Sequence, residues 1–241
     1  MIHWSLDDRV LVAVMDRPER RNALDIATVQ DLQSRFIGRD APAGPVVLTG
    51  AGSTFCSGFD LTTRDQGWDF KDHADALFDA ILAYPAPVIA ALNGHAFGGG
   101  AEVAVAADIR IAADDVKIAF NQVKLEIMPA WGGAERLAAL VGKSRALLLA
   151  GTGTPLGAAE AERIGLVDVV FPRSSFEAGW RSVATSLARR PATEIKRVIR
   201  GVSPDEAIAS FARLWVADAH WQAAERVMNR NGPRREIGGA T

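Results

Sequence analysis

The first 120 residues alternate short apolar runs with helical patterns, and this alternation limits the possible folds more than any other feature of the sequence. The apolar runs are rich in Val and Ile and predict buried strands at residues 10–15, 46–48, 88–92 and 109–112. Between these runs, helical spacing predicts a helix over residues 26–37, capped by Asp25, and a second helix over residues 71–82. Strands that alternate with helices in this way indicate an α/β fold.

After Pro129 the pattern changes, and helices follow one another with one predicted strand at residues 167–171. The predicted helices cover residues 134–140, 144–150, 157–164, 176–189, 193–200 and 204–228. The last helix carries more large apolar residues than a solvated helix normally exposes, namely Ile208, Phe211, Leu214, Trp215 and Val216. Either the chain's own core or a second subunit must cover this apolar face, and both alternatives stay open.

The composition narrows the class of protein. The chain of 241 residues has 27 Lys and Arg against 29 Asp and Glu, a formal net charge of −2, so we expect no nucleic acid as a partner. Cys56 is the only cysteine, which excludes an intrachain disulfide and favours a reducing compartment. The four histidines are scattered without ligand spacing, so no metal site is predicted. Because the N-terminus lacks a signal-peptide pattern and the most apolar stretch, residues 87–113, contains charged residues, we expect a cytoplasmic protein without membrane contact.

A glycine-rich segment, residues 93–102, follows the predicted strand at 88–92 and opens a small-residue helix predicted over 101–107. The three glycines at 98–100 leave the backbone N–H groups at the helix start uncovered, and such groups favour an oxygen that carries or develops negative charge. Glu102 lies in the first turn of this helix. It is either an end charge stabilised by the helix dipole or a general base, and the segment alone does not separate these roles.

A second segment, residues 55–61, follows the predicted strand at 46–48 in a similar way. Gly58 lets the backbone present the next amide, that of Phe59, outward. Two such amides, one from each segment, form an oxyanion hole, which is a pair of fixed N–H donors for an oxygen that gains negative charge.

Five motifs in order make the sequence resemble the enoyl-CoA hydratase/isomerase family, the crotonase superfamily. Residues 17–24 (RPERRNAL) resemble the coenzyme A loop of this family, and residues 47–61 and 87–108 resemble its two oxyanion segments. The fourth motif covers residues 123–137, with Pro-Ala-Trp-Gly-Gly at 129–133, and the fifth covers residues 158–170.

The resemblance implies a spiral of repeated ββα units over residues 1–175, followed by a helical trimerisation segment over residues 176–241. It also implies a trimer or a dimer of trimers, and an enzyme of fatty acid metabolism that takes a coenzyme A thioester as its substrate and needs no further cofactor. The thioester oxygen would lie between the amides of Phe59 and Gly99. Contacts with coenzyme A or the acyl group are implied for Arg20, Arg21, Ala23, Asp60, Leu61 and Trp131.

Hydratases of this family hold a water molecule between two glutamates, and the resemblance places Glu102 at the first position and Gln122 at the second. A glutamine amide holds water by hydrogen bonds but cannot donate or accept a full proton at neutral pH. Because general acid or base assistance contributes about 10²–10⁴ in rate, we expect hydration that is slow or altered at Gln122. Whether Glu126 or His73 also faces the site stays open.

Enoyl-CoA hydration, a lyase reaction, is the leading hypothesis, and three alternatives stay open. A decarboxylase of short branched malonyl-CoA thioesters needs the same oxyanion hole but no pair of glutamates. An enoyl-CoA isomerase works with one carboxylate. A non-catalytic acyl-CoA binder keeps the fold without the chemistry.

Overall fold

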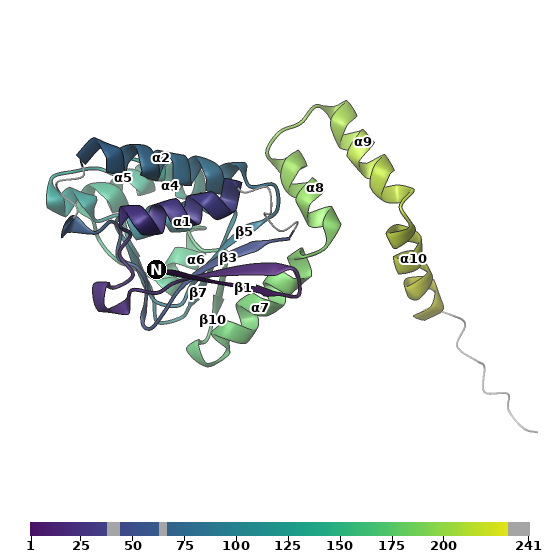
Figure 1. Ribbon diagram of the computed structural model, residues 1–241, viewed down its shortest axis with the longest axis horizontal. Helices are drawn as coiled ribbons and strands as arrows, with labels where there is room; N and C mark the ends of the chain where they lie inside the picture. Colours follow the sequence, from purple (N-terminus) through teal and green to yellow (C-terminus); the bar gives the residue numbers. More distant parts are fainter. Residues whose placement is uncertain (38–43, 63–66, 231–241) are drawn as a thin grey trace, which may run out of the picture. The chain divides into compact units, whose positions relative to one another are not determined.

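A six-stranded sheet runs through the middle of the first of two units in the computed structural model, which describes residues 1–37, 44–62 and 67–230 (Figure 1). The sheet has the strand order β1 (Ile2–Asp7), β2 (Val10–Met15), β3 (Val46–Gly50), β5 (Val88–Leu92), β7 (Ile109–Ala113) and β10 (Val169–Phe171). β1 is antiparallel to β2, and all other neighbouring strands are parallel. Parallel strands are buried on both faces, which explains the unbroken apolar runs of β3 and β5.

A second, smaller sheet contains very short strands. Its order is β4 (Thr54–Cys56), β6 (His95–Phe97), β8 (Lys117–Ala119) and β9 (Leu156–Gly157). Each of β3, β5 and β7 is followed along the chain by a strand of this second sheet, and α2 and α3 are the α-helices that come after the first two pairs. The chain therefore repeats a ββα unit, and the predicted α/β fold with a ββα spiral is confirmed.

The helices of the first unit cover the large sheet and carry the site. They are α1 (Ile26–Ile37), α2 (Gly67–Ala83), α3 (Gly99–Ala106), α4 (Gly133–Val141), α5 (Lys143–Thr152), α6 (Ala158–Arg163) and α7 (Phe176–Leu187). Short 3-10 helices occur at η1 (Pro18–Arg20), η3 (Gln122–Leu125) and η4 (Arg173–Ser175). The predicted cap of α1 is confirmed, because the Thr28 N–H donates to Asp25 Oδ1 at 2.8 Å.

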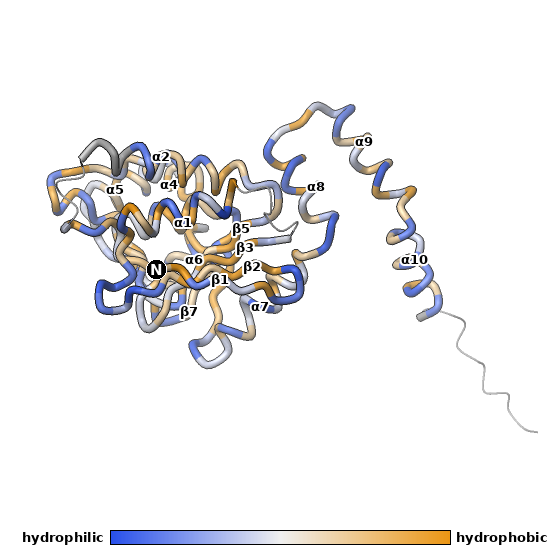
Figure 2. Tube along the Cα trace, viewed as in Figure 1, coloured by the Kyte–Doolittle hydropathy of each residue, from blue (hydrophilic) through white to orange (hydrophobic). Residues whose placement is uncertain are grey.

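The hydrophobic core lies between the large sheet and these helices. Figure 2 shows the strands of the large sheet as one of the most hydrophobic parts of the chain. α1 packs beside α2, and α7 contacts β7 and β10. Helix α3 is buried over its whole length, which its sequence of small and apolar residues allows. The first turn of α3, which includes Glu102, is therefore held inside the unit.

The second unit, Glu194–Thr241, contains α9 (Pro204–Trp215) and α10 (Asp218–Arg230), while α8 (Arg190–Ile199) spans the boundary between the units. The prediction of a single helix over 204–228 is wrong. The Ala217 N–H bonds the Leu214 carbonyl, an i to i−3 contact that tightens and ends α9, and Asp218 then starts α10 with a favourable charge at its N-terminus.

The two compact units are Met1–Thr193 and Glu194–Thr241, and α7 packs within the first. The sequence analysis divided the chain after residue 175, into a ββα spiral and a trimerisation segment. The role of residues 176–241 in trimerisation stays a prediction. Within the ranges that the structure describes, we find no helix with the length and apolar character needed to cross a membrane.

Candidate active site

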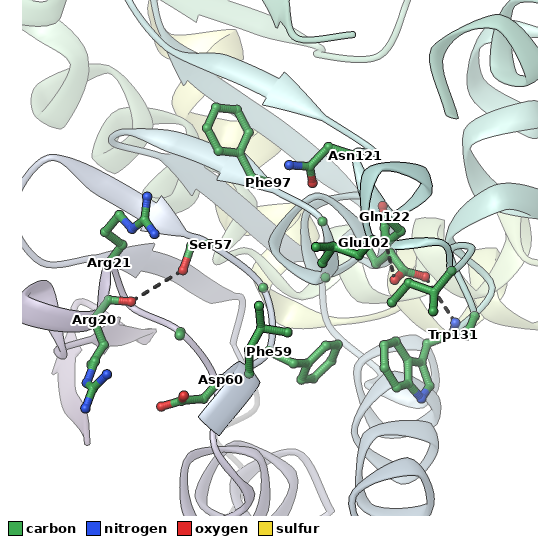
Figure 3. A pocket seen from close by; sticks show the side chains of 18 of the residues that line it. Arg20, Arg21, Ser57, Phe59, Asp60, Phe97, Glu102, Asn121, Gln122 and Trp131 are labelled. Carbon is green, nitrogen blue, oxygen red and sulfur yellow. Dashed lines mark hydrogen bonds between the residues drawn. The ribbon is translucent and has the colours of Figure 1, made fainter. Parts of the chain in front are cut away.

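A cavity of about 800 Å³ opens in the first unit at the edge where β4 and β6 end (Figure 3). The residues singled out in the sequence all line it: Arg20, Arg21, Ala23, Phe59, Asp60, Leu61, Gly99, Glu102, Gln122 and Trp131. They come from five separate segments, so the fold brings together residues up to 111 positions apart, from 20 to 131.

Glu102 lies in the first turn of α3 and is fully buried. Its Oε2 accepts a hydrogen bond of 2.9 Å from Gln122 Nε2, and its Oε1 accepts one of 3.1 Å from the Trp131 N–H. The Gly133 N–H also donates to this carboxyl group. Burial raises the pKa of Glu102, and these hydrogen bonds, with the charge of Arg136, only partly oppose that shift. A carboxyl group with a raised pKa is suited to take up and return a proton near neutral pH.

Gln122 begins the 3-10 helix η3 and is 6% exposed. Its Nε2 binds Glu102, while its Oε1 is buried and has no hydrogen-bond partner among the described residues. A buried carbonyl oxygen without a donor is unfavourable, so this atom is suited to accept a hydrogen bond from a molecule that enters the cavity.

Two glycine turns face each other beside Glu102. Gly58 has φ +99°, and a Cβ added there would lie 2.9 Å from the Gly99 backbone nitrogen. A Cβ added at Gly99 would lie 2.5 Å from the Phe59 ring. The two backbones thus approach more closely than any other residue type would allow. The Gly99 N–H is the first of α3, where no acceptor is available within the helix.

The peptide of Phe59 has a fixed orientation. The Leu24 N–H donates to the Gly58 carbonyl at 2.8 Å, and the Asp60 N–H donates to the Leu24 carbonyl at 2.8 Å. In this parallel bridge, the N–H of the middle residue, Phe59, points away from Leu24. The segment therefore turns the Phe59 amide to the side opposite Leu24, consistent with the predicted donor position.

The two ends of the cavity differ in chemistry. Figure 3 shows Arg20, Arg21 and Asp60 at one end and Glu102 with its partners at the other. Arg20 and Arg21 are exposed. One end therefore offers guanidinium groups to an anion in solvent, and the other offers a buried carboxyl group.

An aromatic wall borders the Glu102 end. The rings of Phe59 and Trp131 are 4.2 Å apart between centroids, and Phe78 stacks on Trp131 at 6.1 Å. Arg136 lies over the Phe78 ring and donates to the Trp131 carbonyl. This arrangement fixes the Trp131 peptide, whose N–H holds Glu102.

The sequence left open whether Glu126 and His73 face the site, and the structure shows where both residues lie. Glu126 has a left-handed φ of 57°, is exposed and does not line the cavity. His73 bonds Gln30 at 3.1 Å and also lies outside the cavity lining. Sequence reasoning placed Gly133 and Arg136 in the fourth motif but gave neither residue a role beside Glu102.

The described part of the chain contains no group of three or more His, Cys, Asp or Glu side chains placed to hold a metal ion. The sole cysteine, Cys56, is buried, and burial raises the pKa of its thiol to about 12.

A spiral of ββα units in which a buried carboxyl group lies beside two facing glycine turns defines a crotonase-type protein. The family model of enoyl-CoA hydratase/isomerase matches residues 6–209, and the chain belongs to this family, whose members act on acyl-CoA substrates. It is a hydratase-like enzyme.

Individual relatives support this assignment. The chain is 36% identical over 202 residues to a probable enoyl-CoA hydratase of Rhodobacter capsulatus, covering 82% of this chain and 79% of that relative. It is 30% identical over 215 residues to the 2,3-dehydroadipyl-CoA hydratase of Escherichia coli, covering 87% and 84% of the two chains. Its structure is similar to the crystal structure of enoyl-CoA hydratase from Bacillus anthracis, with a TM-score of 0.85, 29% identity and coverage of 97% and 98%.

Proposed function

We propose that this protein adds water to the double bond of a 2-enoyl-CoA thioester, with Glu102 as the group that moves the proton. The observation that carries the proposal is the buried Glu102 carboxyl group, held by Gln122 and Trp131 in the same cavity as the Gly58 and Gly99 turns. The names of the relatives agree with this reaction.

The reaction balances with one carboxyl group. Glu102 takes a proton from water, the water oxygen adds to C3, and the electron pair of the double bond moves toward the thioester oxygen. The amides of Phe59 and Gly99 stabilise that negative charge, an effect for which one donor contributes roughly 10²–10³ in rate. Glu102 then returns its proton to C2, which completes the addition.

Gln122 has a supporting role in this scheme. Its Oε1 is buried without a partner among the described residues, so it accepts a hydrogen bond from the attacking water, while its Nε2 holds Glu102. Because the amide neither gains nor loses a proton at neutral pH, all proton transfer falls to Glu102.

The Arg20 and Arg21 side chains at the opposite end of the cavity bind the phosphates of coenzyme A in this proposal. Guanidinium groups suit phosphate because they are always charged and donate several hydrogen bonds. Ala23, Asp60, Leu61 and Trp131 contact the rest of the thioester.

One observation favours a second candidate, isomerisation of a double bond. The pair of Glu102 and Gln122 leaves one group able to exchange protons, and a shift of a double bond needs only one such group. In that reaction Glu102 removes a proton from C2 of a 3-enoyl thioester and returns it to C4.

Product analysis tests these candidates together. Purified protein is incubated separately with crotonyl-CoA, 3-butenoyl-CoA and methylmalonyl-CoA, and the products are identified by mass spectrometry. We expect 3-hydroxybutanoyl-CoA from crotonyl-CoA. Conversion of 3-butenoyl-CoA to crotonyl-CoA without hydration would establish the isomerase, and release of carbon dioxide from methylmalonyl-CoA would establish a decarboxylase. Tight binding of all three without turnover would show a non-catalytic binder.

We also propose that the protein is a trimer or a dimer of trimers and acts in the cytoplasm. In the second unit, Ile208, Phe211, Trp215 and Val216 line a depression of about 220 Å³, and all four residues are exposed, Trp215 by about half. Such a patch suits a subunit interface. The single free cysteine, Cys56, suits a reducing compartment.

A further inference from the structure

The loop between β2 and α1 contains two neighbouring residues in a strained conformation. Arg21 and Asn22 have φ values of 52° and 55°, which lie in the left-handed region that residues other than glycine rarely adopt. The Asn22 side chain, 1% exposed, holds this turn. Its Oδ1 accepts from the Arg17 N–H at 2.9 Å, and its Nδ2 donates to the carbonyls of Ala51 and Thr54 at 2.9 and 2.6 Å.

This strained turn places Leu24 beside Phe59 of the first oxyanion segment. Leu24 is fully buried and bonds Gly58 and Asp60 on either side of Phe59, as described above. The direction of the Phe59 amide therefore depends on where the loop places Leu24.

The guanidinium group of Arg17 ties both segments together. Its Nη1 donates to the Ala23 carbonyl at 2.8 Å and lies 3.0 Å from Asp25 Oδ2, while its Nη2 donates to Asp60 Oδ2 at 2.9 Å. The side chains of Arg17 and Asp60 are 19% and 8% exposed, so water screens this ion pair less than a surface pair. Arg17 thus bonds both Ala23, which precedes Leu24, and Asp60, which follows Phe59.

We infer that Arg17 is a positioning residue that fixes the Phe59 amide for the thioester oxygen, an inference that rests on the oxyanion hole in the proposed function. Arg17 does not line the cavity, whereas its neighbours Arg20 and Arg21 do. The loop therefore has two separable tasks: exposed guanidinium groups bind coenzyme A, and the shielded guanidinium group of Arg17 orients a donor for the reacting oxygen.

These tasks give opposite kinetic signatures. An amide that stabilises charge developing in the transition state contributes to kcat, whereas a uniform contact with coenzyme A contributes to KM. For Arg17→Met we expect kcat with crotonyl-CoA to fall about 10–10²-fold with KM within about twofold of wild type, because the donor is displaced and not removed. For Arg20→Ala we expect KM to rise while kcat falls much less.

A spectroscopic readout separates orientation of the donor from the reaction itself. Butanoyl-CoA labelled with ¹³C at the thioester carbonyl has no double bond to hydrate, and its carbonyl stretch falls in frequency when N–H groups donate to the oxygen. Infrared difference spectra are recorded with wild type, Arg17→Met, Arg17→Lys and Arg20→Ala. Arg181→Met is the matched control, since it removes the exposed ion pairs with Asp7 and Glu177 away from the cavity lining.

We expect the full frequency shift in wild type, Arg20→Ala and Arg181→Met, a smaller shift in Arg17→Met and an intermediate one in Arg17→Lys, whose single ammonium cannot reach all three acceptors. A folded Arg17→Met variant with the full shift and wild-type kcat would overturn the inference. If Arg17→Met does not fold, Asp60→Asn breaks the same ion pair at nearly constant volume and must show the reduced shift. A wild-type protein that shifts the carbonyl stretch but hydrates nothing would refute the proposed reaction and leave the role of Arg17 intact.

Discussion

Gln122 donates a hydrogen bond of 2.9 Å from Nε2 to the Oε2 atom of Glu102, and the oxygen of the same amide has no partner among the described residues. The first contact stabilises the ionised form of Glu102, and burial opposes it. The pair therefore contains one group that exchanges protons and one neutral group that orients both its neighbour and a ligand.

Replacing Gln122 by Glu supplies a second proton-exchanging group at nearly the same volume. We expect the rate of crotonyl-CoA hydration to rise by roughly 10²-fold, the lower part of the range for general acid–base assistance. Two carboxyl groups within hydrogen-bond distance do not both ionise readily, so one apparent pKa rises and the pH profile of kcat shifts on its alkaline side. Initial rates from pH 5 to 9 measure both effects. A variant that folds like wild type and hydrates no faster would show that proton supply does not limit the reaction.

The raised pKa of Glu102 makes a prediction about stability. A carboxyl group whose pKa is higher in the folded protein keeps its proton longer there than in the unfolded chain, where the ordinary value is 4.5. The folded protein therefore loses stability as the pH rises from about 4.5 through the raised pKa of Glu102. Glu102→Gln removes this loss, and its amide can donate to the unpartnered Gln122 oxygen after a rotation of the Gln122 amide.

Urea unfolding at fixed protein concentration tests the predicted direction of this pH dependence of stability. We expect Glu102→Gln to have a higher unfolding midpoint than wild type at pH 8, and the difference between the two proteins to shrink at pH 4. A difference that grows as the pH falls would mean that Glu102 has a lowered pKa in the folded protein.

Gly133 leaves room for the Glu102 carboxyl group. A Cβ added there would lie 2.4 Å from both Cγ and Oε1 of Glu102, so Gly133→Ala must displace the carboxyl group. We expect hydration to fall about 10–10²-fold, the effect of a misplacement near 1 Å. Gly157→Ala is the matched control, because Gly157 has φ −75° and no atom within 4 Å of an added Cβ. Equal activity of the two variants would contradict the geometry of the carboxyl group.

The apolar patch of the second unit predicts an assembly. Phe211 is 61% exposed there and lies next to Trp215, with ring centroids 5.6 Å apart. We expect light scattering to give the mass of a trimer or hexamer for wild type, and Phe211→Asp to lower that mass because the interface cannot bury a charge. A wild-type monomer of 25.7 kDa at micromolar concentration would rule out the assembly.

The fold was partly predictable from the sequence, and there is a physical reason why some strands were predicted and others were not. β3 and β5 were predicted because strands buried on both faces leave continuous apolar runs, and β7 because its other four residues are apolar around the buried Arg110. The three-residue strands β4, β6 and β8 were not, since three residues are too few for a periodic pattern and their partners lie far away in sequence, as in the pairing of Ala96 with Ile118. Long-range pairing of this kind is decided by the packed sheet and not by local propensity.

The candidate site was also predicted only in part. Side chains with distinctive chemistry, such as Glu102 and Gln122, were found from residue type and motif order, and they line one cavity. The contacts that hold Glu102 were not found, because the Trp131 N–H and Gly133 N–H belong to the backbone, which every residue shares. In the sequence, the adjacent glycines at 132 and 133 were the sign of the turn that presents these amides, in which Gly132 has φ +71°.

The rate at which wild type and Glu102→Gln hydrate crotonyl-CoA, compared at equal occupancy, tests the central claim most directly. The Kd of each protein for butanoyl-CoA, which cannot react, sets the occupancy. We predict that wild type forms 3-hydroxybutanoyl-CoA and that Glu102→Gln binds butanoyl-CoA as well but hydrates about 10²–10⁴-fold more slowly. Hydration by Glu102→Gln at the wild-type rate, or no hydrated product from wild type, would contradict the assignment of Glu102 as the proton-transferring group of an enoyl-CoA hydratase.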